Sequence, residues 1–327
     1  MTDAAVSERA APAGGIRVGI SACLLGQQVR FDGGHKKDAF LTDVLAPHVE
    51  WVPICPEVEV GMGTPRETLR LVRENGRIRM VTTRSAFDYT DAMTGWSRRR
   101  VEALAGEDLD GYVLKKDSPS CGMERVKVYG SDGPGVRDGR GLFAGALLAR
   151  LPLLPVEEEG RLCDARIREN FIECVFAYRR LKDLFASRWS IGALVRFHTV
   201  HKMSLLAHST TAYRELGRLV AGASQLARQD LRSRYEQLFM ATLSSPSTTR
   251  RHTNVLSHMA GYLKDKLDPA SRQELVGCIE EYRTGLVPLI VPLTLIKHHV
   301  RVHDVEYLAG QLYLQPHPRE LMLRNHV

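Results

Sequence analysis

The sequence IRVGISACLLG occupies residues 16–26 and places a cysteine directly after a short apolar run. Two further segments repeat this arrangement, WVPIC at residues 51–55 and GYVLKKDSPSC at residues 111–121. Short apolar runs that end beside Gly or Pro are typical of buried strands. The three segments therefore predict three strands, each of which leads into a thiol.

The three thiols belong to Cys23, Cys55 and Cys121. In an open parallel sheet, ligands bind beyond the carboxyl ends of the strands, so these distant residues are expected to meet there. Three thiolates suit a soft metal ion or an iron–sulfur cluster. A structural zinc ion normally has four protein ligands. Three ligands therefore indicate an open coordination position and a catalytic site.

The composition is that of a globular protein, with 44% hydrophobic and 25% charged residues among 327. This length predicts two domains. No apolar stretch reaches the ~18 residues of a membrane span. Residues 1–15 lack the features of a signal peptide and are expected to form a disordered tail. We therefore expect a cytoplasmic protein without membrane contact, whose cysteines are reduced or metal-bound.

The net charge of +7 is unevenly distributed along the chain. Residues 1–150 carry 21 Lys and Arg against 20 Asp and Glu, whereas residues 151–327 carry 24 against 18 and hold ten of the twelve histidines. A basic half suits a polyanion such as RNA. A solvated basic surface without a partner is equally consistent with the composition.

The pattern of the chain changes near residue 160. Up to Val156, apolar runs alternate with helical patterns, which predicts a Rossmann-like α/β domain with a mostly parallel sheet over residues 16–158. The sequence EEEG at residues 157–160 indicates a linker. Longer helical periods then predict an all-α domain over residues 164–318 and a tail over 319–327. The helical patterns cover residues 36–45, 92–105, 142–151, 165–185, 191–208, 213–220, 228–243 and 250–267.

Polar side chains accompany the predicted thiol site. Glu57 lies two residues after the second thiol, where a carboxylate in a closed pocket can act as a general acid or base. Ser118 and Ser120 come just before the third thiol. Alone, Glu57 is equally an ordinary surface residue. Their shared position at strand ends favours one common site.

Three segments, SACLLGQQVRFDGGHK, ICPEVEVGMGTPRE and KKDSPSCG, resemble the signature blocks of the bacterial 2-thiouracil desulfurase family. The resemblance runs from about Ile16 to Val156. It implies a 4Fe–4S cluster with three cysteine ligands, Cys23, Cys55 and Cys121. The fourth iron has no protein ligand and takes up the thione sulfur of the substrate.

The same resemblance implies roles for three further residues. Glu57 matches the catalytic carboxylate of the family. Ser118 is the preferred match for the active-site serine, with Ser120 as the alternative. Glu57 would take a proton from an attacking water while the serine hydrogen-bonds the substrate ring. The products would be an oxo base and sulfide, without net electron transfer.

The second half resembles the YbgA-like helical domain from about Asp164 to Pro318. The segments that carry this resemblance are FHTVHK, LAHS, AYRELG and RHTNVLSH. Fusions of the two domains resemble desulfidases that convert 4-thiouridine in tRNA to uridine. The resemblance therefore implies thiolated tRNA as the substrate. The target base would have to leave its stack to reach the cluster.

Six residues of the helical half are candidate contacts to an RNA backbone: His198, His201, Lys202, Tyr213, Arg250 and Arg251. His198 and Lys202 lie one helical turn apart, so one helix face can present both. Ordinary helix packing remains an alternative for all six. A metal site between His201 and His208 is a further alternative.

Two other functions remain open at this point. The same cluster could act on free thiolated bases or nucleosides such as 2-thiouracil, with the helical domain used only for dimerisation. The chain could instead be a non-catalytic accessory protein that binds nucleic acid and contains a structural cluster or zinc ion. The sequence predicts no particular oligomeric state.

Overall fold

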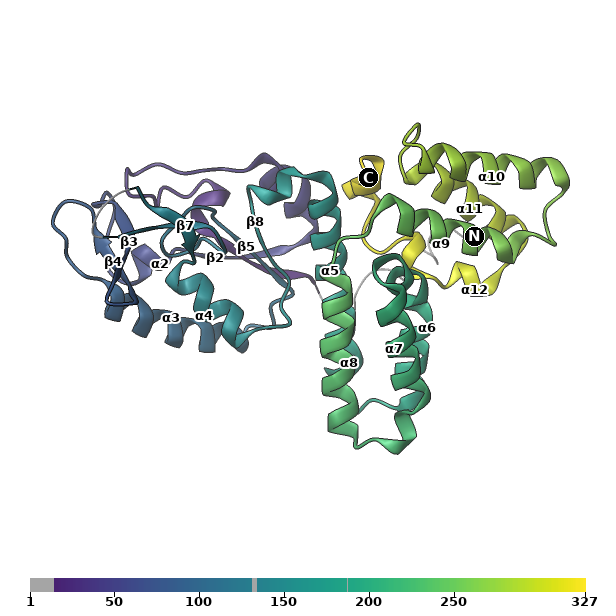
Figure 1. The fold of residues 1–327 in the computed structure, drawn as a ribbon, viewed down its shortest axis with the longest axis horizontal. Coiled ribbons are helices and arrows are strands. Elements are labelled where there is room, and N and C mark those ends of the chain that lie inside the picture. The colour runs from purple at the N-terminus through teal and green to yellow at the C-terminus, as the bar shows by residue number, and fades with distance from the viewer. Residues whose placement is uncertain (1–14, 131–133, 187) are drawn as a thin grey trace. The chain divides into compact units, whose positions relative to one another are not determined.

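The computed structural model describes residues 15–130, 134–186 and 188–327 (Figure 1). The chain divides into two compact units between Cys163 and Asp164, where the sequence pattern changes. The tail predicted for residues 1–15 lies outside the described residues, except for Gly15. None of the described helices is long and apolar enough to cross a membrane.

The N-terminal unit is built on a four-stranded parallel sheet with the strand order β2-β1-β5-β8. The strands are β1 (Arg17–Ser21), β2 (Glu50–Ile54), β5 (Gly111–Leu114) and β8 (Val156–Glu158). β1 pairs in parallel with β2 and β5, and β5 with β8. Every residue of β5 is buried, as expected of a central parallel strand. The predicted α/β class is confirmed.

A second four-stranded sheet was not expected from the sequence. Its order is β4-β3-β6-β7, and its strands are β3 (Leu69–Glu74), β4 (Arg77–Thr82), β6 (Val126–Tyr129) and β7 (Val136–Gly139). β3 pairs antiparallel with β4 and parallel with β6, while β6 and β7 are antiparallel. Only part of this sheet packs into a core. Its strands contain many charged residues and no continuous apolar run, which is why the sequence pattern did not predict them.

The helices of this unit are the four-residue α2 (Pro56–Glu59), α3 (Thr90–Ala105) and α4 (Leu142–Arg150). The last two confirm predicted helices. The prediction for residues 36–45 is only partly correct, because a π-type helix covers Phe40–Leu45 alone. Lys36 instead donates its backbone N–H to the carbonyl of Cys23 at 2.9 Å. That hydrogen bond holds the preceding loop against the first thiol segment.

The three consecutive glutamates predicted as a linker are buried, so that prediction is wrong. Two of them belong to strand β8. Glu158 accepts a hydrogen bond from the backbone N–H of Met123 at 2.7 Å, and Glu159 accepts one from that of Lys116 at 2.7 Å. These carboxylates therefore brace the loop that carries the third thiol.

The C-terminal unit is all-helical, as predicted. Its helices are α5 (Ala165–Ala186), α6 (Ile191–His208), α7 (Thr210–Ala221), α8 (Arg228–Leu243), α9 (Thr249–Leu263), α10 (Pro269–Arg283), α11 (Ile290–Val302) and the short α12 (Glu306–Ala309). Four of them begin with a polar side chain that accepts a backbone N–H: Ser190, Ser209, Thr248 and Asp268. Such caps set where a helix starts.

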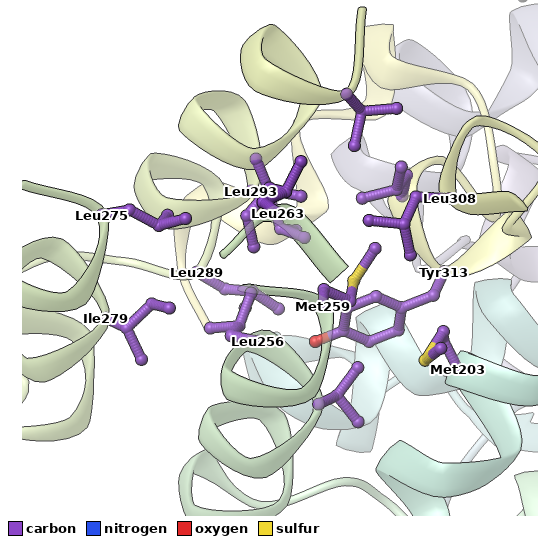
Figure 2. Packing of buried hydrophobic residues seen from close by; sticks show 14 of the residues in the cluster. Met203, Leu256, Met259, Leu263, Leu275, Ile279, Leu289, Leu293, Leu308 and Tyr313 are labelled. Carbon is purple, nitrogen blue, oxygen red and sulfur yellow. The ribbon is translucent and has the colours of Figure 1, made fainter. Parts of the chain in front are cut away.

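An apolar cluster of α6, α9, α10, α11 and the segment beyond α12 forms a core of this unit (Figure 2). Leu256, Met259 and Leu263 recur at spacings of three or four on α9 and are fully buried. Leu293 of α11 and Tyr313 belong to the same cluster. The strong helical period of α9 therefore reflects its contribution to a core.

The residues predicted as a C-terminal tail pack into the helical unit through a buried ion network. Nε of Arg324 lies 2.9 Å from Oε1 of Glu169, and its Nη2 lies 3.8 Å from Oε2 of Glu173. His208 Nε2 lies 3.5 Å from the same Glu173 oxygen. Burial opposes ionisation of both carboxyls. The positive partners nevertheless lower the pKa of Glu169 to about 2 and hold that of Glu173 well below its usual value.

Arg324→Met is expected to destabilise the helical unit by about 3–5 kcal/mol at pH 7, because it removes the arginine from two buried carboxylates and leaves only His208 and His317 beside them. In the variant the carboxyl pKa values rise in the folded state, so protonation relieves the penalty as the pH falls. Denaturant unfolding at pH 7 and pH 5 should show a deficit that shrinks in acid. Arg319→Met is the matched control, since Arg319 is exposed. A deficit independent of pH would contradict this account.

Candidate active site

The three thiols line one pocket at the carboxyl edge of the parallel sheet. Cys23 lies in a 3₁₀ turn directly after β1, Cys55 lies between β2 and α2, and Cys121 follows β5. All three contribute to a cavity of about 390 Å³. They come together because β2, β1 and β5 are adjacent and parallel.

A tight turn holds Cys121 in place. The backbone N–H of Gly122 donates to the carbonyl of Ser118 at 2.8 Å, and that of Cys121 donates to Ser118 Oγ at 3.1 Å. A Cβ at position 122 would lie 2.3 Å from Cγ2 of Val126 and 2.9 Å from the Ser118 carbonyl. Only glycine fits there, so the SPSCG sequence sets the position of the thiol through its backbone.

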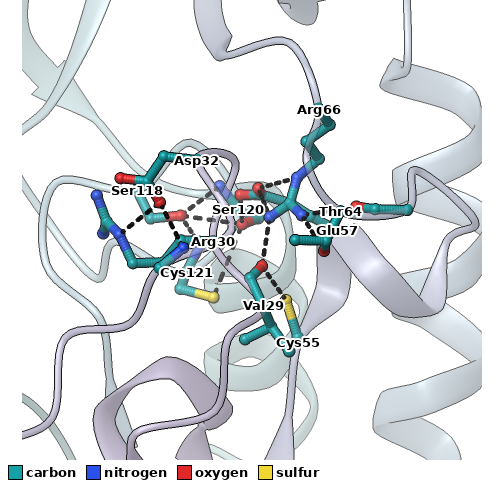
Figure 3. Close-up of polar contacts among 12 residues, drawn as sticks. Val29, Arg30, Asp32, Cys55, Glu57, Thr64, Arg66, Ser118, Ser120 and Cys121 are labelled. Carbon is teal, nitrogen blue, oxygen red and sulfur yellow. Dashed lines mark hydrogen bonds and ion pairs between the residues drawn. The ribbon is translucent and has the colours of Figure 1, made fainter.

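Glu57 is the centre of a hydrogen-bonded group beside the thiols (Figure 3). Its Oε1 accepts from Ser120 Oγ at 2.7 Å, and its Oε2 accepts from Arg66 Nη2 at 2.6 Å and Nε at 3.0 Å. Ser120 Oγ also lies 2.9 Å from Ser118 Oγ. The structure therefore places Ser120 directly against Glu57. Ser118, the serine preferred from the sequence, supports the turn and reaches Glu57 only through Ser120.

Burial opposes ionisation of all three thiols. It is the largest cause that raises the pKa of Cys23 to about 11, and it raises the pKa values of Cys55 and Cys121 as well. A bound cation would have to replace these protons before the thiols could act as thiolate ligands. Metal binding at this site is therefore expected to release protons.

The donor set fits an iron–sulfur cluster, because thiolates are the ordinary protein ligands of such clusters. Throughout the described part of the chain, no three His, Cys, Asp or Glu side chains are grouped to hold a single metal ion. A cluster does not require three donors around one atom, since each thiolate binds a separate iron. Cys23, Cys55 and Cys121, which line one cavity, meet this requirement.

Positive side chains and one aromatic ring also line this pocket. Lys115 is paired with Glu159 at 2.5 Å. For Lys36 and Lys116, no carboxylate within the described ranges lies within 4.0 Å. Phe31 is 38% exposed, and the Arg30 guanidinium lies 5.3 Å from its ring centroid. The charges of Lys36 and Lys116 act at longer range on Asp32 and Asp117. The pocket therefore offers an apolar ring face and exposed positive side chains to a substrate.

The prediction that His198 and His201 contact RNA is wrong for the structure described, because they are only 3% and 2% exposed. His201 Nδ1 lies 2.7 Å from the carbonyl of Phe197, so the ring serves helix packing. Burial lowers the pKa of His198 to about 4 and that of His201 to about 3, so both rings are neutral near pH 7. The alternative metal site between His201 and His208 is not supported, since His208 pairs with Glu173.

The other four candidates for RNA contact reach the surface to different degrees. Arg250 is exposed, while Lys202, Tyr213 and Arg251 are half-buried. Arg250 and Arg251 lie in the first turn of α9. These four residues remain available to a partner.

Comparisons with known proteins relate both halves of the chain to families. Residues 18–159 match the family model for 2-thiouracil desulfurase, and residues 202–318 match a model described as a protein of unknown function, DUF1722. The chain is 38% identical over 161 residues to the uncharacterized protein YbgA of Escherichia coli K12. This match covers 49% of this chain and 95% of YbgA. It is 28% identical over 109 residues to the uncharacterized protein YbbK of Bacillus subtilis 168, covering 32% of this chain and 71% of YbbK.

A solved structure titled as the [4Fe-4S]-dependent thiouracil desulfidase TudS is 31% identical to this chain. The match covers 45% of this chain and 93% of TudS, with a TM-score of 0.38. Fold and site together define an α/β domain with a thiol-lined pocket suited to an iron–sulfur cluster. The domain of residues 18–159 therefore belongs to the 2-thiouracil desulfurase family, and a DUF1722 domain follows it in the chain.

Proposed function

We propose that this protein is an iron–sulfur-dependent desulfidase that converts 4-thiouridine in tRNA to uridine and releases sulfide. The observation that carries the proposal is the single pocket shared by three thiols and the Glu57–Ser120 pair. Membership of the 2-thiouracil desulfurase family and the sequence identity with TudS support it. The balanced reaction takes C=S and one water to C=O and hydrogen sulfide, so no oxidant or reductant is needed.

Cys23, Cys55 and Cys121 would hold the cluster, whose open iron supplies a soft Lewis acid for the thione sulfur. Glu57 would accept a proton from the water that attacks the ring carbon. Ser120 donates to the Glu57 carboxylate at 2.7 Å and lies within hydrogen-bonding distance of Ser118. Ser120 would therefore connect Glu57 to Ser118 by hydrogen bonds. A positioned general base of this kind contributes about 10²–10⁴-fold to a rate.

The walls of the pocket support a nucleotide as the substrate. The exposed Phe31 ring can stack on a pyrimidine, since stacking between bases and aromatic rings is sequence-tolerant and favourable. Lys36 and Lys116, each without a carboxylate within 4.0 Å in the described chain, can neutralise phosphates. The pocket therefore favours a thiolated base that is attached to a phosphate backbone.

A surface of the helical unit supports RNA as the larger partner. Arg251, Asn254, His258 and Tyr262 recur at spacings of three or four residues, so they share one face of α9. Tyr262 is 42% exposed, and its ring centroid lies 5.0 Å from that of Tyr307. The His258 ring meets the Tyr262 ring edge to face, with the centroids 5.4 Å apart. Aromatic rings beside cations suit unpaired bases and their phosphates.

The test is anaerobic reconstitution of the full chain with iron and sulfide, followed by incubation with tRNA that contains 4-thiouridine. Nucleoside analysis should show loss of 4-thiouridine, an equal gain of uridine and one sulfide released per base. If the tRNA stays intact while free 2-thiouracil is desulfurated, the substrate is the free base. Every residue of the pocket comes from the N-terminal unit, and this observation favours that second function. No reaction with either substrate would contradict both.

Tyr262→Ala in the full chain should raise the KM for tRNA by about 5–150-fold, because loss of one stacking ring costs roughly 1–3 kcal/mol. The rate on free 2-thiouracil should change little, since α9 contributes nothing to the thiol pocket. Val276→Ala is the matched control, because Val276 is also an exposed apolar residue, on α10. An unchanged KM for tRNA would remove the α9 face from the proposal.

A further inference from the structure

Arg66 is the most fully engaged side chain of the pocket. Its Nε and Nη2 donate to Oε2 of Glu57, and Nη2 also donates to the carbonyl of Val29 at 2.9 Å. Its Nη1 donates to the carbonyl of Gly63 at 2.9 Å and to Thr64 Oγ1 at 3.3 Å. A guanidinium has five N–H groups, and five acceptor contacts surround this one.

These contacts join three segments of the site. The Val29 carbonyl also lies 3.7 Å from the Sγ of Cys55, and the backbone N–H of Arg66 donates to the carbonyl of Phe31 at 2.8 Å. Arg66 thus binds the loop after the first thiol, the chain at 63–64 and Glu57 (Figure 3). Its side chain is only 6% exposed, so bulk water does not compete for these bonds.

We infer that Arg66 is a positioning residue of the reaction and acts through Glu57. The fork of Arg66 occupies Oε2 of Glu57, which leaves Oε1 to face Ser120. Oε1 is therefore the oxygen that serves the pocket. This inference rests on the proposed function, because that function makes Glu57 the general base. Lysine cannot replace Arg66, because one ammonium lacks the planar fork that meets a carboxylate on two bonds.

The experiment compares Arg66→Gln and Arg66→Lys in the wild type and in the Glu57→Gln background. In the wild type, Arg66→Gln should lower kcat on 2-thiouracil by about 10–100-fold, the usual cost of losing a side chain that orients a functional group. The KM should change by less than ~3-fold, and the iron and sulfide content should stay at the wild-type level. Arg66→Lys should recover only part of the loss. In the Glu57→Gln background the same Arg66 changes should cost little, because the oriented base is already absent.

Arg150→Gln is the matched control, because Arg150 also makes two bonds to one carboxylate, that of Glu102, but at an exposed site on α4. It should leave kcat unchanged. An equal loss of kcat in the Glu57→Gln background, or a loss of iron from the Arg66 variants, would overturn the inference. A crystal structure of the metal-free Arg66→Gln variant gives a readout independent of activity. It should show the Glu57 carboxylate turned away from Ser120, and an unmoved carboxylate would also overturn the inference, even if the wild type proved inactive.

Discussion

Cys121→Ser should abolish desulfurase activity and lower the iron bound after anaerobic reconstitution. A hydroxyl is a poor ligand for iron compared with a thiolate. Even the loss of a residue that merely supports a ligand costs about 10–100-fold in affinity or activity, so the loss of a ligand should exceed this range. The variant should fold, because the turn around Cys121 is held by backbone groups and Ser118. Iron and sulfide analysis, together with the rate on 2-thiouracil, measures both effects.

The matched control for this prediction is Cys163→Ser in the same unit. Cys163 is exposed and contributes nothing to the thiol pocket. Its replacement should leave iron content and rate at the wild-type level. Cys121→Ser protein that retains full iron and full activity would contradict the assignment of three thiolate ligands. Loss of activity with iron fully retained would make Cys121 important for chemistry but not for cluster binding.

The meeting of the three thiols could be predicted from sequence because it follows from the topology of the sheet. Each apolar run marks a strand, and parallel neighbouring strands end at one edge. Once β2, β1 and β5 are adjacent, Cys55, Cys23 and the loop to Cys121 have to lie together. Helices such as α7 and α9 are equally predictable, since each buries an apolar face with a period of 3.6 residues. The predicted helical ranges end at residue 267 and therefore omit α10, α11 and α12.

The remaining features of the fold depend on contacts that no local pattern records. Glu158 and Glu159 are acidic residues, yet they are buried because backbone N–H groups and Lys115 satisfy their carboxylates. His198 and His201 are polar residues of a type usually found at the surface, yet they are buried inside the helical unit. In both cases tertiary partners overcome the usual preference of a polar side chain for water.

The hydrogen bonds of the polar residues in the site also could not be predicted from the sequence. Ser118 and Ser120 are two residues apart, and no sequence pattern decides which hydroxyl meets Glu57. The turn decides it, because the Ser118 oxygen accepts backbone N–H groups while Ser120 points at the carboxylate. No sequence pattern singles out Arg66 either, because its five hydrogen bonds go to acceptors on four residues that only folding brings together.

Glu57→Gln should lower kcat by about 10²–10⁴-fold, the contribution expected of a general base, which corresponds to about 3–5 kcal/mol of transition-state stabilisation. The amide has the same shape as the carboxylate. Its oxygen can still accept from Arg66, and its NH₂ group can donate to Ser120, so the side chain should keep its position. What it loses is the ability to take a proton from water. Iron content and KM should therefore stay close to wild type while kcat falls.

Glu59→Gln provides a control from the same helix turn. Glu59 lies two residues further along α2, forms an ion pair with Arg100 at 3.5 Å and contributes nothing to the thiol pocket. A general effect of removing a negative charge near the cysteines should appear in both variants, whereas loss of the base should appear only in Glu57→Gln. Equal falls in kcat would therefore reject Glu57 as the base. If kcat of the Glu57 variant falls together with its iron content, Glu57 acts in cluster assembly. Only a fall in kcat at full iron content shows a loss of proton transfer.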